Sequence, residues 1–184
     1  MLTDDAHSGA WLVDCGDVEP LLPLIGDTLL GVLLTHEHFD HIYGLNELLR
    51  HFPNVPIYTN ERGREGLLSD RLNFSKYHDG SFVFEHPQNV RLVSDGQRID
   101  LFDGVTARAW FTPGHSPACI TWHVPLTQDS GALFTGDSYI PGIKTVTTVP
   151  RADKELAASN TLAIIRFASS AHADIYPGHQ PNPM

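Results

Sequence analysis

A cluster of polar side chains at residues 35–41 (Thr-His-Glu-His-Phe-Asp-His) constrains this chain most, because it directly follows the apolar run 29–34. An apolar run of this length, rich in leucine, predicts a buried strand that ends at the cluster. Side chains two residues apart in extended backbone point the same way, so His36 and His38 can converge on one point. Asp40 and His41 lie where the chain turns toward a helical stretch, and they can address a second point nearby. Imidazoles and a carboxylate are ligands that zinc and ferrous iron accept. We therefore predict a metal site here rather than a histidine-rich surface turn.

Composition and charge exclude several classes of protein. The 184 residues fit a single domain spanning 1–184, and 41% apolar with 18% charged residues is typical of a globular chain. The net charge of −10 argues against a nucleic-acid partner, whose phosphates need basic surface. No apolar run approaches the roughly 20 residues that span a bilayer. Residues 1–5 lack the basic and apolar regions of a signal peptide, so we expect a cytoplasmic protein without a membrane partner.

The two cysteines, Cys15 and Cys119, lie in strand-like runs without the spacing of a disulfide framework. We therefore expect both to behave as small buried hydrophobic side chains.

The N-terminal half alternates strand and helix patterns, which predicts a layered α/β architecture. The expected strands cover 10–17, 29–35 and 55–58, and the expected helices cover 18–28, 42–52 and 61–68. Residues 69–89 have no clear period but carry aromatic and cationic side chains. We expect this segment to be an ordered loop that borders the substrate site.

Short β segments dominate the C-terminal half. They are expected at 90–93, 98–101, 105–112, 119–124, 131–135 and 173–176, with one helix at 153–169. Three of these segments lead into glycine-containing turns that carry His115, Asp137 and His179. One polar strand end would mean little, but four that all carry histidine or aspartate are hard to explain as turn chemistry.

The motifs His-x-His-x-Asp-His, Thr-Pro-Gly-His-Ser, Thr-Gly-Asp-Ser and Pro-Gly-His together resemble those of the metallo-β-lactamase superfamily. The resemblance extends from Asp14 to His179, and it is strongest toward the glyoxalase II-like (hydroxyacylglutathione hydrolase-like) hydrolases. It implies a four-layer αββα sandwich of two mixed sheets with helices outside. Members of the family usually have one or two strands before the stretch that matches residues 10–14, so one sheet is expected to lack N-terminal edge strands.

The resemblance also implies a binuclear metal site. One metal would bind His36, His38 and His115. The second would bind Asp40, His41 and His179, with Asp137 bridging the two. Two zinc ions are expected, with iron or manganese as alternatives. Asp14 matches an aspartate that orients a ligand histidine in the family, although an aspartate at a strand end can also serve as a turn cap.

The implied reaction is hydrolysis of an ester, thioester or lactone in a small-molecule substrate by a hydroxide shared between the metals. Asp40 can accept the proton of this hydroxide or orient it. Tyr139 either donates a hydrogen bond to the substrate oxyanion or only packs. Cationic, aromatic and histidine side chains that can hold an anionic substrate, or be solvated loop residues, are Arg71, Lys76, Tyr77, His78 and Lys144. The histidines expected at the surface or in packing are His51, His86, His123 and His172.

Two departures from the family narrow the substrate. Asp137 stands where many zinc β-lactamases have a cysteine, which disfavours penicillin hydrolysis. Five residues follow His179, whereas glyoxalase II enzymes carry a further helical region that holds glutathione. Glutathione thioester specificity is therefore not implied.

Two other functions remain open at this point. Persulfide dioxygenases of the same superfamily bind one iron at positions matching His36, His115 and Asp137, and the cysteine and threonine at 119 and 121 resemble theirs. A degenerate member with a structural metal is the other alternative, although a structural site needs only about four ligands. The native metal would separate the hydrolase from the dioxygenase. The sequence predicts no oligomeric state.

Overall fold

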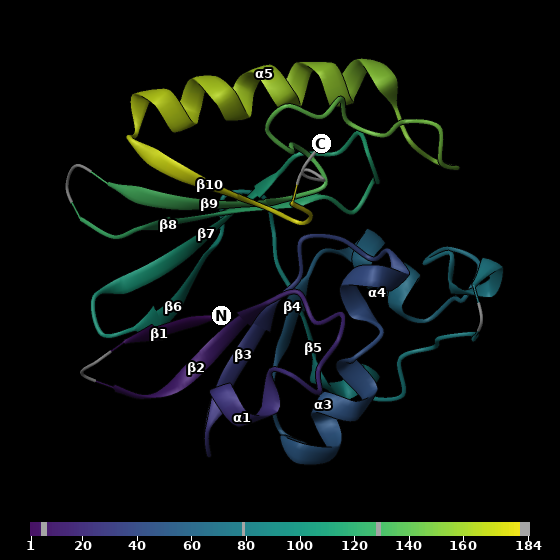
Figure 1. Cartoon of the computed structure of the whole chain (residues 1–184), viewed down its shortest axis with the longest axis vertical. Coiled ribbons are helices and arrows are strands. Elements are labelled where there is room, and N and C mark those ends of the chain that lie inside the picture. The colour runs from purple at the N-terminus through teal and green to yellow at the C-terminus, as the bar shows by residue number, and fades with distance from the viewer. Residues whose placement is uncertain (5–6, 79, 128–129, 181–184) are drawn as a thin grey trace. The chain divides into compact units, whose positions relative to one another are not determined.

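The computed structural model describes residues 1–4, 7–78, 80–127 and 130–180. The chain forms two compact units, Met1–Val93 and Ser94–Met184, and each contains one five-stranded sheet (Figure 1). Whether the two units fold as the single domain expected from chain length stays a prediction.

The sheet of the first unit has its strands in chain order. It consists of β1 (Leu2–Asp4), β2 (His7–Val13), β3 (Leu29–Leu33), β4 (Ile57–Thr59) and β5 (Val90–Leu92). β1 pairs antiparallel with β2, and every later pair is parallel. Parallel strands bring their carboxyl ends to one edge, so the residues that follow β2 and β3 lie at the same edge. β1 was not predicted, and β2 begins before residue 10. The first sheet therefore has an N-terminal edge strand, β1, that was not expected from the sequence.

Short helices connect these strands: α1 (Leu22–Ile25), α2 (Phe39–Ile42), α3 (Leu45–His51) and α4 (Glu61–Leu67), with 3₁₀ turns η1 (Ser75–Tyr77) and η2 (Pro87–Asn89). The prediction of one helix over 42–52 was wrong. Continuing a helix through Leu45 would require its N–H to reach the carbonyl of His41. That carbonyl accepts the N–H of Cys15 at 2.8 Å instead, and the N–H of Gly44 donates to Cys15 O at 3.0 Å. A Cβ at residue 44 would collide with the carbonyl of Gly16, so only glycine fits this crossing.

The predicted helix over 18–28 is also shorter than expected. Only α1 is helical, with a proline in its first turn and Gly26 at its C-terminus, where φ is positive (72°). Proline is favoured at the start of a helix and glycine at its end, and here the two residues limit α1 to about one turn.

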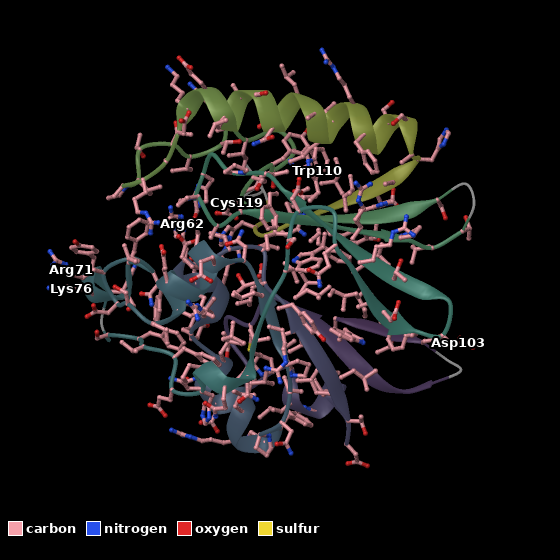
Figure 2. All side chains as sticks on the ribbon, turned by 180° about the vertical axis from the view of Figure 1, so that it is seen from behind. Arg62, Arg71, Lys76, Asp103, Trp110 and Cys119 are labelled. Carbon is pink, nitrogen blue, oxygen red and sulfur yellow. The ribbon has the colours of Figure 1, made fainter. Side chains whose placement is uncertain are left out.

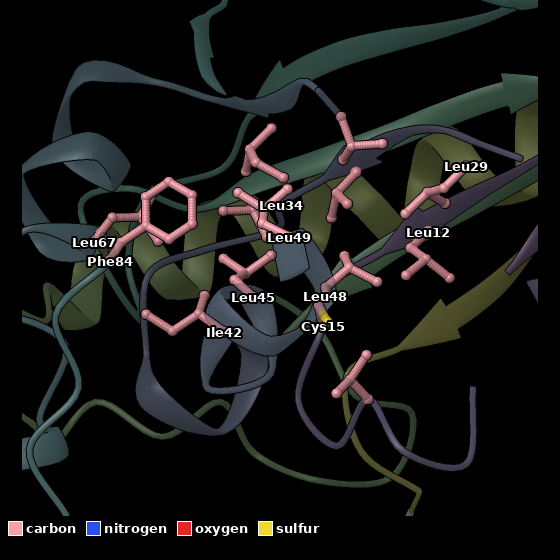
Figure 3. Packing of buried hydrophobic residues seen from close by; sticks show 14 of the residues in the cluster. Leu12, Cys15, Leu29, Leu34, Ile42, Leu45, Leu48, Leu49, Leu67 and Phe84 are labelled. Carbon is pink, nitrogen blue, oxygen red and sulfur yellow. The ribbon is translucent and has the colours of Figure 1, made fainter. Parts of the chain in front are cut away.

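The hydrophobic core of the first unit lies between the sheet and the helices that follow β3 (Figure 3). Leu45, Leu48 and Leu49 project from one face of α3 and are buried, as the apolar spacing predicted. They pack in one cluster with Leu12 of β2 and with Leu34, which follows β3. This packing fixes the end of β3, the strand that leads into the histidine cluster.

The second unit contains a mixed sheet and one long helix. Its strands are β6 (Arg98–Phe102), β7 (Val105–Phe111), β8 (Ile120–Pro125), β9 (Gly131–Gly136) and β10 (Ala173–Pro177), in the order β10-β9-β8-β7-β6. The pairs β6–β7, β7–β8 and β8–β9 are antiparallel, whereas β10 runs parallel to β9. A parallel pair needs a long crossover, and α5 (Lys154–Ser170) lies in that connection (Figure 1).

Helix α5 begins at a side-chain cap and packs on the sheet of its own unit. Asp153 Oδ1 accepts the N–H groups of Glu155 and Leu156, both at 2.9 Å. The ring of Phe167 lies 5.6 Å from that of Trp110 on β7. The buried residues of the helix are Ala157, Ile164 and Ala168, and two of these three have small side chains. Among the described residues, no helix is both long enough and apolar enough to cross a membrane.

Candidate metal centre

The predicted ligands of the first unit lie at the carboxyl end of β3. Residues 34–38 continue beyond the strand, and α2 begins at Phe39. The imidazole rings of His36 and His38 are 4.5 Å apart, and those of His36 and His41 are 4.1 Å apart. Asp40 lies beside them, with Oδ2 3.8 Å from Nε2 of His41. The alternation of extended backbone and the first turn of α2 thus bring together the four ligands predicted from this motif.

Asp14 orients two of these histidines. It directly follows β2 and has a left-handed backbone conformation (φ 59°) that aspartate tolerates better than most residues. Its Oδ2 lies 2.8 Å from Nδ1 of His41 and accepts the hydroxyl of Thr35 at 2.7 Å, while Oδ1 accepts the N–H of Thr35 at 2.7 Å. Because the hydroxyl proton of Thr35 goes to the carboxylate, its oxygen accepts Nδ1–H of His36 at 3.1 Å.

These bonds assign the tautomers of both rings. His36 and His41 carry their protons on Nδ1, which leaves the lone pair of each ring on Nε2. A neutral imidazole held in this way by a carboxylate is the usual form of a metal-ligating histidine. The donor set of the first unit therefore fits a divalent metal ion, and Asp14 is a positioning residue in addition to its place in the turn.

The loop expected at 69–89 contacts the histidine cluster through Phe74. The Phe74 ring lies 4.7 Å from that of His38, and its backbone is left-handed (φ 67°), which is rare for a bulky residue. The buried side chain of Asn73 holds this conformation by donating to Gly66 O and Phe82 O and by accepting Ser75 N–H. Of the described part of this loop, residues 73–75 are ordered as expected. Whether the loop meets substrate stays a prediction.

The predicted ligands of the second unit also converge. Asp137 follows β9, and its Oδ2 lies 3.6 Å from Nε2 of His115 and 3.6 Å from Nε2 of His179. Nδ1 of His115 lies 2.8 Å from the carbonyl of Val146 and donates to it, so its lone pair also lies on Nε2. The glycine-containing turns after three different strands thus aim a carboxylate and two imidazoles at one place within this unit.

Buried hydroxyl groups support the turn that carries Asp137. The Thr112 hydroxyl lies 2.9 Å from that of Thr121 and 3.0 Å from that of Ser138, and Ser138 also donates to Thr112 O. All three side chains are buried. They join the ends of β7 and β8 to the residue after Asp137, so they fix the position of its backbone.

The loop that carries His115 is attached to α5. The Asp153 N–H donates to Gly114 O at 2.7 Å, and the Asn160 side chain donates to Pro113 O at 2.6 Å. Gly114 has φ 152°, and a Cβ there would meet the backbone of Ala157 at 2.5 Å. Glycine is therefore required for the loop to approach the helix this closely.

The remaining predicted residues have less specific surroundings. Tyr139 is half-buried near Asp137, and its role stays a prediction. Arg71, Lys76, Tyr77 and His78 are exposed on the loop of the first unit, and Figure 2 shows Arg71 and Lys76 at its outer end. Lys144 is exposed on the connection between β9 and α5.

The histidines expected outside the ligand set lie at the surface or against aromatic rings. His51 and His172 are exposed, while His86 packs on Phe84 and His123 packs on Phe167. Burial and the positive charges of Arg108 and Arg98 lower the pKa of His123.

Both cysteines are buried and neither is in a disulfide, as expected. Burial raises the pKa of the Cys15 thiol to about 12, and the carboxylates of Asp14 and Asp17 add to this effect.

Sequence reasoning missed the side chains that hold the ligands in place. Thr35 was assigned only as a strand end, Ser138 only as part of a motif, and Phe74 as one aromatic residue of a loop. The position of Thr35 directly before His36 could have predicted this role, because a hydroxyl on the preceding residue can reach Nδ1 of the imidazole. No feature of the sequence predicts the left-handed conformation of Phe74.

Comparison with known proteins identifies the family and the fold. The family model of the metallo-beta-lactamase superfamily matches residues 7–179. A hydroxyacylglutathione hydrolase of Synechococcus sp. is 31% identical over 148 residues, which are 77% of this chain and 50% of that protein. The probable metallo-hydrolase YqgX of Bacillus subtilis is 34% identical over 118 residues, 64% of this chain and 53% of that protein. The chain thus spans about half the length of the curated relatives it matches.

Solved structures share the fold. The BLEG-1 B3 metallo-beta-lactamase superposes with a TM-score of 0.83 at 25% identity, covering 98% of this chain and 85% of that one. TTHA1623 in a di-iron-bound form gives a TM-score of 0.73 at 24% identity, covering 92% and 81%. The mixed α/β structure with two five-stranded sheets therefore has the metallo-β-lactamase fold. With the family model matching nearly the whole length, the chain belongs to the metallo-β-lactamase superfamily.

Proposed function

We propose that the protein is a metal-dependent hydrolase in which the ligand groups of the two units together hold two divalent ions. One ion would bind His36, His38 and His115. The other would bind Asp40, His41 and His179, with Asp137 shared between them. One observation carries this proposal: Nδ1 of His36, His41 and His115 is hydrogen-bonded to an acceptor, so each ring offers Nε2 to a metal.

The relatives support hydrolysis as the reaction class. Several that are about 30% identical are named hydroxyacylglutathione hydrolases, and YqgX is named a probable metallo-hydrolase. We propose an ester, thioester or lactone as the bond cleaved in a small, anionic substrate. Zinc is the metal we propose first, because imidazoles and carboxylates suit it, and iron and manganese are the alternatives.

Two bound divalent ions would supply a water of lowered pKa and an electrophilic contact for the acyl carbonyl. The side chain of Asp40 is 54% exposed beside His41, so its carboxylate can orient an incoming water or accept its proton. Asp14 would keep the proton of His41 on Nδ1 throughout turnover, because a carboxylate accepts a hydrogen bond more strongly than a neutral group does.

Metal content of the protein purified without added metal is the first test. About two zinc ions per chain, with hydrolysis of at least one member of a panel of esters, thioesters and lactones, is the expected result. About one iron per chain, with oxygen uptake on a glutathione persulfide, would replace the hydrolase with the dioxygenase alternative. A fully metal-loaded protein that hydrolyses nothing on the panel would refute the proposal.

Asp40→Asn tests the proposed role of the exposed carboxylate. We expect kcat to fall by about 10²–10⁴, the usual contribution of a general acid or base. Asp27→Asn is the matched control, since Asp27 is an exposed carboxylate elsewhere in the first unit. Equal activity of both variants would remove Asp40 from the mechanism.

Tyr139→Phe separates the two roles open to this residue. If the phenol donates to the substrate oxyanion, the variant loses kcat by about 10²–10³ with little change in KM, whereas a packing residue leaves kcat unchanged. Thermal unfolding of the variant provides the control, because removing a hydroxyl from a packed ring changes stability rather than turnover.

A further inference from the structure

A cavity in the second unit lies apart from the predicted metal ligands of that unit. Its volume is about 350 Å³, and it is lined by the first turns of α5 and by the connection between β9 and α5. None of the ligand residues His115, Asp137 and His179 lines it. This volume is at the lower end of small-molecule sites, so the cavity suits a ligand of few atoms.

The lining of the cavity is amphiphilic. Ile143, Ala158 and Leu162 provide apolar surface, and Leu162 is 55% exposed. Lys144 and Lys154 stand at the same cavity, and neither makes an ion pair with any part of the chain that the structure describes. Both lysines are exposed and bring positive charge to an otherwise apolar lining. The lining therefore complements a ligand with an aliphatic part and one negative charge.

The cavity wall is bonded to the residues that position the ligands of this unit. The Thr145 and Thr161 hydroxyls lie 3.2 Å apart, and they donate to Ser138 O at 3.3 and 3.4 Å. Val146, in the same connection, accepts Nδ1–H of His115. A molecule seated in the cavity would thus contact Thr145 and Thr147, the residues on either side of Val146.

We propose that this cavity binds a small amphiphilic carboxylate, such as a short-chain fatty acid, with the chain against Leu162 and Ala158 and the carboxylate between Lys144 and Lys154. None of the proposed metal ligands lines the site, and we assign Lys144 to this cavity instead of to the substrate of the hydrolase. Through Thr145 and Thr161, the cavity wall is hydrogen-bonded to the carbonyl of Ser138, the residue after Asp137.

The test is a titration of ¹⁵N-labelled protein, carrying its native metal, with hexanoate. We expect shifts of the backbone amides of Thr145, Ala158 and Leu162. Acetate, which lacks the chain, and hexanol, which lacks the charge, should each bind more weakly. Four fewer methylene groups, of about 0.8 kcal/mol each when fully buried, correspond to a loss of about 200-fold for acetate, and burial of half of that surface still gives a loss of about tenfold.

Variants separate this cavity from the metal. Lys144→Met and Lys154→Met should each weaken hexanoate binding by about two- to fivefold, the ratio given by an exposed ion pair of up to about 1 kcal/mol. Ala158→Phe replaces an exposed alanine of α5 and should abolish binding by filling the cavity. Arg166→Met is the matched control, because it removes an exposed cation of the same helix outside the cavity.

Three results would overturn the proposal: no shifts with hexanoate, equal affinity in Ala158→Phe, or an equal loss in Arg166→Met. Binding that persists in Ala158→Phe would mean that the carboxylate binds the metal instead. Failure of the hydrolase proposal would leave this titration unaffected, so the two are distinguishable. Circular dichroism of Ala158→Phe checks that the helix is retained.

Discussion

Replacing Asp14 by asparagine tests how far one carboxylate controls the ligand histidines. Asparagine tolerates the left-handed backbone at this position (φ 59°) and keeps one oxygen to accept the N–H of Thr35. Its amide nitrogen, however, donates where Oδ2 accepted. His41 must then accept at Nδ1, which moves its proton to Nε2 and removes the lone pair offered to the metal.

The magnitude follows from the bonds that change. Oδ2 of Asp14 accepts two hydrogen bonds, and a bond to a charged group contributes about 1.5–3 kcal/mol. The Thr35 hydroxyl can turn and accept from the new amide, and the bond between a carboxylate and His41 is replaced by a weaker bond from a neutral amide. We expect the free energy of unfolding of the metal-free protein to fall by about 1–1.5 kcal/mol, the difference between a hydrogen bond to a charged group and a neutral one. Metal affinity should fall by about 10–100-fold, as it does when a partner of a ligand histidine is changed.

Urea unfolding of the metal-free protein measures the first quantity, and competition with a chromogenic chelator measures the second. Asp17→Asn is the control, since Asp17 is exposed in the same turn and, among the residues that the structure describes, its carboxylate accepts only the N–H of Glu19. The reasoning is refuted if Asp14→Asn folds and binds metal as tightly as the control. A loss of stability without a loss of metal affinity would show that Asp14 is only a turn residue.

Three further predictions concern other parts of the chain. Ser138→Ala should lower the free energy of unfolding by about 1–3 kcal/mol, because it leaves the buried Thr112 hydroxyl with one partner fewer, and denaturant titration measures this. The pKa of His123 is lowered in the folded state, so the unfolded chain binds the proton more readily. Stability should therefore fall as the pH drops below about 6.5, and this part of the slope should vanish in His123→Gln when unfolding is compared at pH 7.5 and 5. With a pKa of about 12, the Cys15 thiol should resist alkylation in the folded protein and react only in denaturant, which mass spectrometry can follow; rapid labelling of the native protein would contradict the burial that raises this pKa.

Local patterns in the sequence were enough to predict most of the elements. The apolar run before residue 35, the spacing of Leu45, Leu48 and Leu49 and the glycine-containing turns after the later strands correspond to elements that the structure contains. These signals are local because strand alternation and helix periodicity depend on neighbours within a few residues. The ligand types were visible for the same reason, since histidine and aspartate at strand ends stand out against the apolar runs.

Tertiary contacts decided what no local pattern could. The helix expected over 42–52 is broken because Cys15, far away in sequence, takes the carbonyl that the helix needs. Apolar spacing alone does not predict that Leu162 is exposed while Ala157 is buried. The face of α5 that packs on the sheet is decided by tertiary contacts, and this face carries small residues. The tautomers of the ligand histidines depend on Asp14 and Val146, which lie 27 and 31 residues from their partners. The sequence therefore determined which residues are able to bind a metal, whereas the folded chain determined which nitrogen each one presents, because a hydrogen bond assigns a tautomer only when both partners are in place.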